Sequence, residues 1–230
     1  MYYIAKATCE GEVIGPMYPQ CQKFIKEYDP DVEGGIYWLY DQVIWKKNVL
    51  IKPLIDCYIL SLRSKVTNAL STVCLEPFLD KKTINIISQY NIGNHQIFQS
   101  KVLRNKIYYD YYYLYLKENV LEHIDLQKSV FITEDICHNK FETYTGIRTL
   151  EELDDIRKKL WDSPEGIRLL APYKIFFKRS FNKELDIFDF PDIDQRYSHA
   201  YISKRLKEHL EKENITGLTF TEAQNLYFEE

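Results

Sequence analysis

Short apolar and β-branched runs, broken by polar and glycine-containing stretches, recur along the chain and are typical of β-strands. They predict strands at residues 2–8, 36–45, 54–62, 83–87, 96–102, 108–116, 129–132, 173–178, 200–202 and 215–220. Strand patterns outnumber helical patterns. This favours an α+β fold, a mainly antiparallel β-sheet with a few packed helices.

Apolar residues spaced three and four apart predict the helices. Thr149 and Glu152 have the S/T-x-x-E spacing of a capping box, so a helix is expected over the residues that follow. Ser203 precedes the clearest amphipathic helix, which carries Leu206 on its apolar side. A third, shorter helix is expected after Ser64.

One segment, IYYDYYYLYL at residues 107–116, is unusually rich in tyrosine, of which the chain has 19. Because side chains alternate along a strand, Tyr109, Tyr111 and Tyr113 share one face, while Tyr108 and Tyr112 share the other. Each face is aromatic or apolar over most of its length. We therefore expect a central strand that is covered on both sides.

The length of 230 residues is sufficient for one or two domains with a hydrophobic core. We expect residues 1–230 to form a single α+β domain built from two interlocked parts. The first part, residues 1–75, would hold the N-terminal strands and loops. The second part, residues 76–230, would hold the central sheet and a C-terminal strand–helix–strand unit.

The composition of the chain indicates which binding partners and which cellular compartment to expect. Lys and Arg number 30 against 34 Asp and Glu, a formal net charge of −4, so the basic excess typical of nucleic-acid-binding proteins is missing. The five cysteines are odd in number and have no CxxC pair, as in a reduced cytoplasmic protein. No signal peptide is recognised, and the most apolar stretch, residues 49–62, is too short to cross a bilayer. A cytoplasmic protein without membrane contact is expected.

Sequence motifs for catalysis are not found. The chain has no GxGxxG, phosphate-loop, HExxH or GxSxG sequence. Cys137 and His138 are adjacent and would point to opposite faces of a strand, so we expect no metal site and no cofactor. A cysteine–histidine or paired-carboxylate site can still form in space, which leaves a small hydrolase as the alternative function. No catalytic residue is assigned.

The segment ELDIFDFPDID, residues 184–194, combines acidic and aromatic side chains without a basic residue. We take it as the candidate partner-binding site, formed by Glu184, Asp186, Phe188, Asp189, Phe190, Asp192 and Asp194. Exposed carboxylates speed the encounter with a basic partner, and aromatic contacts supply affinity. The other interpretation is a solvated loop whose aromatic residues anchor it to the protein.

Three segments together resemble bacterial immunity proteins of polymorphic toxin systems, a group first catalogued as a domain of unknown function and later numbered immunity families eleven and forty-three. The C-terminal stretch AYISKRLKEHLEKENITGLTF carries most of the resemblance, through Ile202, Ser203, Leu206, Lys207, Leu210, Glu211, Ile215, Thr216, Gly217, Leu218 and Phe220. Residues 111–131, which include Asp125 and Ser129, and SLRSKVTNAL at residues 61–70 resemble two further family segments. The similarity covers residues 54–223.

The resemblance implies a cytoplasmic protein that binds and neutralises the C-terminal domain of a cognate toxin by occlusion, and that is not an enzyme. The acidic segment suits a basic toxin, such as a nuclease. The residues shared with the family look like determinants of the fold, so Ser203, Leu206 and Gly217 are expected to be structural. The oligomeric state is left open.

Overall fold

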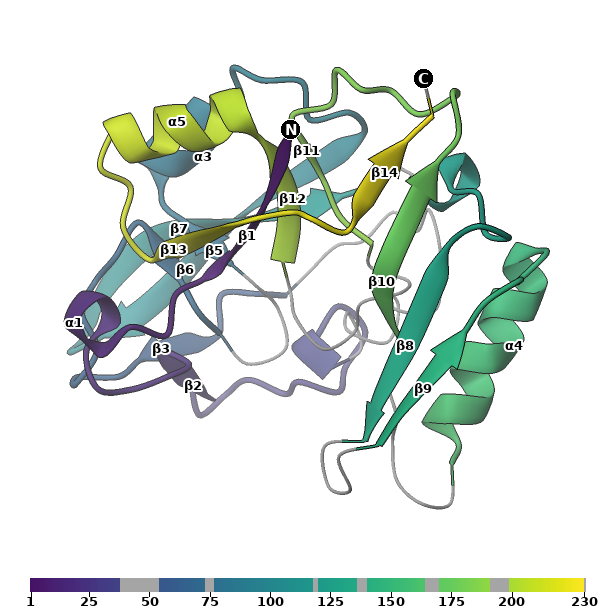
Figure 1. The fold of residues 1–230 in the computed structure, drawn as a ribbon. Helices are drawn as coiled ribbons and strands as arrows, with labels where there is room; N and C mark the ends of the chain where they lie inside the picture. The colour runs from purple at the N-terminus through teal and green to yellow at the C-terminus, as the bar shows by residue number, and fades with distance from the viewer. Residues whose placement is uncertain are drawn as a thin grey trace. The chain divides into compact units, whose positions relative to one another are not determined.

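The computed structural model describes residues 1–37, 54–72, 77–117, 120–135, 140–163, 170–190 and 199–229. They form a mixed α+β structure with mostly antiparallel sheets, so the predicted fold class is confirmed (Figure 1). The chain folds into two compact units whose boundaries differ from the expected division at residue 75. Unit 1 consists of Met1–Glu118, Glu184–Asp189 and Ser198–Glu222, and unit 2 consists of Asn119–Lys183, Phe190–Tyr197 and Ala223–Glu230.

Unit 1 contains a six-stranded sheet in the order β2-β3-β6-β7-β5-β4. Its strands are β2 (Cys21–Phe24), β3 (Tyr58–Leu60), β4 (Ala69–Leu70), β5 (Phe78–Leu79), β6 (His95–Arg104) and β7 (Ile107–Leu116). β6 and β7 form a long antiparallel hairpin around a two-residue turn, in which Asn105 and Lys106 both have positive φ angles. Two such residues are what a type I′ turn requires, and its twist matches that of the strands.

The tyrosine-rich strand β7 is central in this sheet, as predicted, but its two halves differ. Its odd-numbered face is buried from Tyr111 onwards. Ile107 and Tyr108, in contrast, are 56% and 57% exposed. The expectation of a strand covered on both sides is therefore wrong for the first half of β7. β6 pairs with β7 along its whole length, but β5, on the other side, pairs only with Tyr112 and Tyr113 and leaves the first half open.

A second sheet of unit 1 joins distant parts of the chain in the order β11-β12-β1-β13. β1 (Tyr2–Ala7) lies between β12 (His199–Ser203) and β13 (Leu218–Glu222), and β11 (Ile187–Phe188) flanks β12 (Figure 1). Three helices of unit 1 lie wholly within the described residues, α1 (Gly11–Ile14), α3 (Lys81–Ile87) and α5 (Lys204–Lys212). α3 and α5 bury their apolar sides in one core, to which Ile84, Leu206 and Leu210 belong.

Unit 2 contains a four-stranded sheet in the order β14-β10-β8-β9. Its elements are a 3₁₀ turn (Val120–His123), β8 (Val130–Asp135), β9 (Lys140–Tyr144), α4 (Leu150–Trp161), β10 (Leu170–Phe177) and β14 (Leu226–Phe228). The predicted helix after Thr149 is confirmed. The Thr149 side chain accepts the Glu152 N–H at 3.2 Å, and the Glu152 carboxylate accepts the Arg148 N–H at 2.9 Å.

Two predicted elements have the wrong type. Residues 83–87, predicted as a strand, belong to α3, because the Asp80 carboxylate accepts hydrogen bonds from the N–H and the hydroxyl of Thr83 and caps a helix. The helix predicted after Ser64 is not formed, and residues 65–68 instead run without regular secondary structure into β4. The predicted strand at 36–45 lies almost entirely outside the described residues. Within the described ranges, no helix is long and apolar enough to span a membrane.

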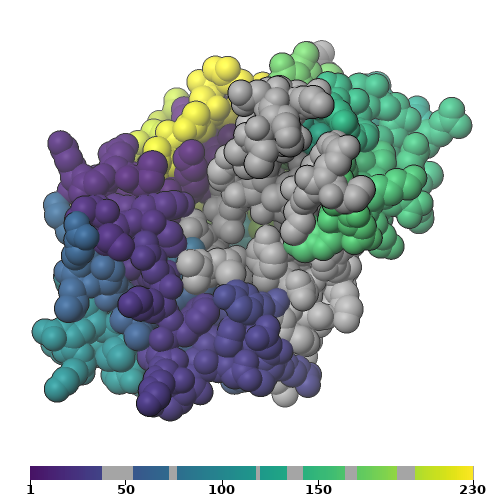
Figure 2. Space-filling view, turned by 90° about the horizontal axis from the view of Figure 1, so that it is seen from below, coloured from purple at the N-terminus to yellow at the C-terminus, as the bar shows by residue number. Residues whose placement is uncertain are grey.

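Hydrogen bonds join the end of the β6–β7 hairpin to the turn before β4. The Arg104 guanidinium donates to the carbonyl oxygens of Leu62 at 3.1 Å and Ser64 at 2.8 Å. Figure 2 shows the two segments, teal and blue, side by side on one face of unit 1. Leu62 and Val66 are exposed here, so apolar side chains reach the surface beside the hairpin.

Candidate functional site

The predicted binding segment, residues 184–194, has side chains that face both inward and outward. Glu184 is exposed and Asp189 is half-buried. The buried residues are Asp186, Phe188 and Phe190. Asp192 and Asp194 lie outside the described residues. The segment also passes from unit 1 to unit 2 after Asp189. Its described residues therefore do not form one continuous acidic surface, and its role in binding stays a prediction.

Asp186 is held by three groups inside unit 1. The Arg205 guanidinium donates from Nε to Oδ1 at 2.6 Å and from Nη2 to Oδ2 at 2.5 Å. The Ser203 hydroxyl donates to Oδ1 at 2.5 Å, and the Asn91 N–H donates to Oδ2 at 3.0 Å. Burial by itself would raise the pKa of Asp186. The hydrogen bonds from Arg205, Ser203 and Asn91 and the charge of Arg205 outweigh burial, and they lower the pKa below its usual value.

The two aromatic residues of the segment are anchored in different units. In unit 1, the Phe188 ring stacks on Tyr201 with 5.3 Å between centroids and meets Tyr2 edge-on at 5.1 Å. In unit 2, the Phe190 ring lies 6.1 Å from that of Phe177. The interpretation of a loop anchored by its aromatic residues therefore fits both phenylalanines.

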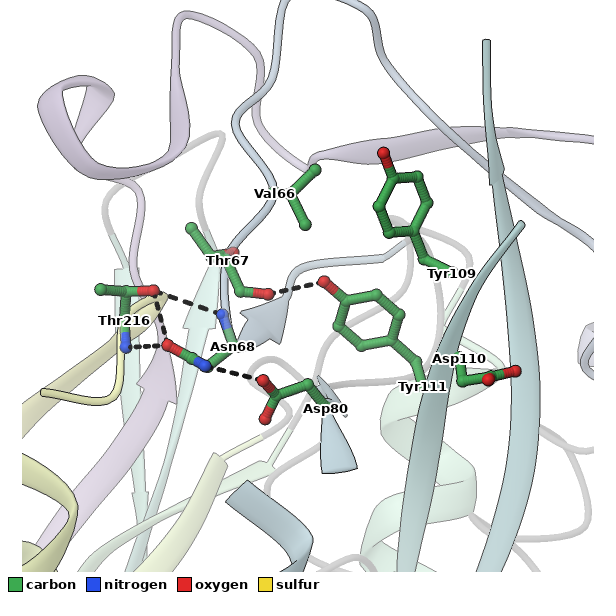
Figure 3. A pocket seen from close by; sticks show the side chains of 8 residues that line it. All are labelled: Val66, Thr67, Asn68, Asp80, Tyr109, Asp110, Tyr111 and Thr216. Carbon is green, nitrogen blue, oxygen red and sulfur yellow. Dashed lines mark hydrogen bonds between the residues drawn. The ribbon is translucent and has the colours of Figure 1, made fainter. Parts of the chain in front are cut away.

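A pocket of about 250 Å³ opens on unit 1, beside the first half of β7 (Figure 3). It is lined by Val66, Thr67, Asn68, Asp80, Tyr109, Asp110, Tyr111 and Thr216. Figure 3 shows the rings of Tyr109 and Tyr111 extending from β7 toward residues 66–68, whereas the Asp110 side chain points away from them. This follows from the sequence, because neighbouring residues of a strand face opposite sides.

Hydrogen bonds hold the walls of the pocket in place. The Tyr111 hydroxyl donates to the Thr67 carbonyl at 2.6 Å, and the Asn68 amide donates to the Asp80 carboxylate at 2.7 Å. The N–H and the hydroxyl of Thr216 each donate to the Asn68 side-chain oxygen at 2.9 Å. Burial, followed by the charge of Asp80, raises the pKa of Tyr111 far above its ordinary value, so its hydroxyl stays a donor at neutral pH. The pocket is therefore preformed.

The buried cysteines do not have the surroundings of an activated nucleophile. Cys21 and Cys57 are fully buried, and burial raises the pKa of each thiol to about 12. Such thiols remain protonated near neutral pH and react slowly. Cys9 is exposed, whereas Cys74 and Cys137 lie outside the described residues. Where the structure describes the chain, no three His, Cys, Asp or Glu side chains are grouped as metal ligands.

The C-terminal residues that carry most of the resemblance lie in β12, in α5, in the turn to β13 and in β13 itself. The Ser203 hydroxyl accepts the Leu206 N–H at 3.2 Å and caps α5, while Leu206 is fully buried. Gly217 has a φ of +91°, and a Cβ added there would lie 2.1 Å from the Ala69 carbonyl oxygen. The expectation that Ser203, Leu206 and Gly217 are structural is confirmed.

The chain was compared with protein-family models and with curated proteins. No protein-family model matches the chain, and no curated protein matches it significantly. Its function is therefore inferred from its residues and their geometry.

The pocket has no counterpart among the sequence predictions. Its lining comes from four separate stretches of the chain, at residues 66–68, 80, 109–111 and 216. The one feature of the sequence that points to the pocket is the alternation along β7, which places Tyr109 and Tyr111 on the same face. Sequence alone does not show that β5 ends after two residues and leaves space beside β7.

Proposed function

We propose that this protein binds the C-terminal domain of a bacterial toxin in the cytoplasm and neutralises it by occlusion, as an immunity protein that catalyses no reaction. The observation that carries this proposal is the resemblance of three segments in the same order, strongest at residues 200–220. The positions of the resembling residues support it. They cap α5, fill its buried side and allow the close contact at Gly217.

Buried residues such as Leu206 and Leu210 cannot contact a partner, so the contact surface is formed by exposed residues. Of the seven residues predicted to bind the toxin, Glu184 is exposed and Asp189 is half-buried. Their negative charge favours a basic toxin, such as a nuclease, through faster encounter. Asp186 is removed from the contact surface, because it is 1% exposed and paired inside unit 1.

Co-expression with the toxin domain encoded by the adjacent gene tests the proposal. We expect the domain alone to stop bacterial growth, and the intact protein to restore growth and to elute with the domain as one complex. Leu206→Asp is the control, because a carboxylate in the core of unit 1 disrupts the fold and should abolish both effects. Unchanged toxicity without a complex would overturn the proposal.

Association kinetics test the acidic contact separately. Glu184→Lys should slow association with the toxin domain at low salt and reduce the dependence of the rate on salt, because opposite charges steer encounter. Glu33→Lys is the matched control, since Glu33 is an exposed glutamate elsewhere in unit 1. Equal rates for the two variants would remove Glu184 from the interface.

A further inference from the structure

The first half of β7 has a strand neighbour on one side only among the described residues. On one side, β6 pairs with β7 along its full length, from Ile107 to Leu116. On the other side, β5 pairs only with Tyr112 and Tyr113. Residues 107–110 therefore form an open edge inside a six-stranded sheet, next to the pocket of Figure 3.

The backbone of this edge offers unused hydrogen-bonding groups. In a two-residue hairpin the residues that flank the turn, here Arg104 and Ile107, bond to each other, and direction then alternates along each strand. The N–H and C=O of Tyr108 and Asp110 thus point away from β6. No hydrogen bond from the described residues reaches them. An extended chain placed along this edge would complete these bonds.

The pocket occupies the position of one missing strand. β4 is the second strand from β7, and Ala69 lies level with Leu79 and Tyr112. Residues 66–68, which lead into β4, therefore pass Tyr109 and Tyr111 two strand positions away. Since neighbouring strands are about 4.8 Å apart, the two walls are separated by about 10 Å. The Asp80 N–H donates to the Asn68 carbonyl at 2.7 Å, so Asp80 fills the place opposite Tyr111, and the Tyr111 hydroxyl bonds to the Thr67 carbonyl and closes this end of the space. We call the remaining space, between residues 107–110 and residues 66–67, the β7 slot.

The side chains of the β7 slot define what would fit. On its inner side lie Tyr109, Tyr111 and Val66, which favour apolar side chains. On its outer side lies Asp110, which is exposed. Residues directly opposite on neighbouring strands share a face and interact. A strand in the slot would therefore place an apolar residue opposite Tyr109 and a basic residue opposite Asp110.

We propose that the β7 slot binds an extended segment of the toxin domain, with a basic residue next to an apolar one, as an added strand in line with β5 and antiparallel to β7. Main-chain hydrogen bonds to Tyr108 and Asp110 supply affinity, and the inner side chains and the Asp110 charge supply specificity. The inference rests on the proposed function for the identity of the partner. Charge complementarity at Asp110 agrees with the basic toxin proposed above.

Filling the slot tests the inference. Val66→Trp should weaken binding of the toxin domain about tenfold or more, because the indole occupies the place of the added strand. Val32→Trp is the matched control, since Val32 is 42% exposed against 41% for Val66 and does not line the slot. Calorimetric titration measures both affinities, and circular dichroism checks that each variant is folded.

A charge reversal covers the case in which Val66→Trp fails to fold. Asp110→Lys lies on an exposed face of β7 and should weaken binding about tenfold through repulsion of the basic residue. Asp31→Lys, at an exposed loop position, should leave binding unchanged. Amide hydrogen exchange should also slow at Tyr108 and Asp110 when the toxin domain binds.

The outcomes separate the two proposals. If the wild-type protein does not bind the toxin domain, the proposed function and the slot inference both fail. If the wild type binds but the folded Val66 and Asp110 variants bind equally well, without protection of the β7 edge, only the slot inference fails. Weakened binding by both variants, with their controls unchanged, supports it.

Discussion

Unit 1 combines an aromatic core with many polar side chains in its interior, whereas the described core of unit 2 centres on stacked aromatic rings. In unit 1, buried Asp186 pairs with Arg205, and the Gln20 amide donates to the Lys65 carbonyl and the Thr67 hydroxyl. In unit 2, the Phe177 ring lies 4.1 Å from Phe181 and 5.0 Å from Phe228, measured between centroids.

This difference has a physical consequence. Most of the free energy of aromatic packing comes from removing apolar surface from water, and this contribution does not depend on direction. Buried hydrogen-bonded groups instead require one geometry, since a group that loses its partner bears a desolvation penalty. Unit 2 should therefore be sensitive mainly to lost volume, and unit 1 also to displaced backbone and to lost hydrogen-bond partners.

Phe177→Ala should have the largest effect. It removes a fully buried ring from the aromatic cluster of unit 2 and should lower the free energy of unfolding by about 3–5 kcal/mol. Urea denaturation measures the loss, and hydrogen exchange should quicken in β8 and β10. Tyr173→Ala, at a 53% exposed position of β10, is the control. Equal losses from the two substitutions would contradict a packed aromatic centre.

Gly217→Ala should destabilise unit 1 by about 3 kcal/mol. The left-handed backbone alone costs a side chain about 1–2 kcal/mol, and the contact of the new Cβ with the Ala69 carbonyl adds to this. Gly146→Ala in unit 2 is the matched control, since Gly146 has a φ of +70° with nothing within 4 Å. Urea denaturation should show the smaller loss for Gly146. Equal losses would exclude the contact as a cause.

Asp186→Ala should cost about 2 kcal/mol at pH 7, because it leaves the Asn91 N–H and the Ser203 hydroxyl without their acceptor. The lowered pKa means that the carboxylate stabilises the fold above its ordinary pKa of 3.8, and that this stability is lost as pH falls through the folded-state pKa.

Stability measured against pH checks this sign. The wild type should lose more stability than Asp186→Asn as the pH falls below 3.8. Asp31→Asn, at an exposed position, should follow the wild type. Parallel curves for the wild type and Asp186→Asn would show that the bonded carboxylate contributes nothing to stability.

Lys128→Ala should have the smallest effect. Lys128 bridges Asp125 at 3.1 Å and Glu229 at 2.7 Å in unit 2, but its side chain is 56% exposed and water screens the pair. We expect no measurable change in urea denaturation. A loss as large as that of Asp186→Ala would show that exposed and buried ion pairs do not differ here.

The elements that were correctly predicted have local causes. The cap at Ser203 and the capping box at Thr149 act within four residues, and the alternation of β7 acts within one strand. The wrong predictions arise where other contacts outweigh the local pattern. Residues 83–87 have the β-branched composition of a strand, but the Asp80 cap and the core shared with α5 favour a helix. Likewise, the sequence around Asp186 predicts an exposed carboxylate, but in the folded protein Asp186 is buried and pairs with Arg205.

The amino-acid sequence by itself determined the α+β class, the helices that begin at Thr149 and Ser203, and the strand alternation that puts Tyr109 and Tyr111 on one face, because these depend on neighbouring residues. The tertiary structure alone decided that β1 lies between β12 and β13, that Asp186 is buried, and that a pocket opens beside the first half of β7. These depend on where distant segments end and pair, which no local pattern contains.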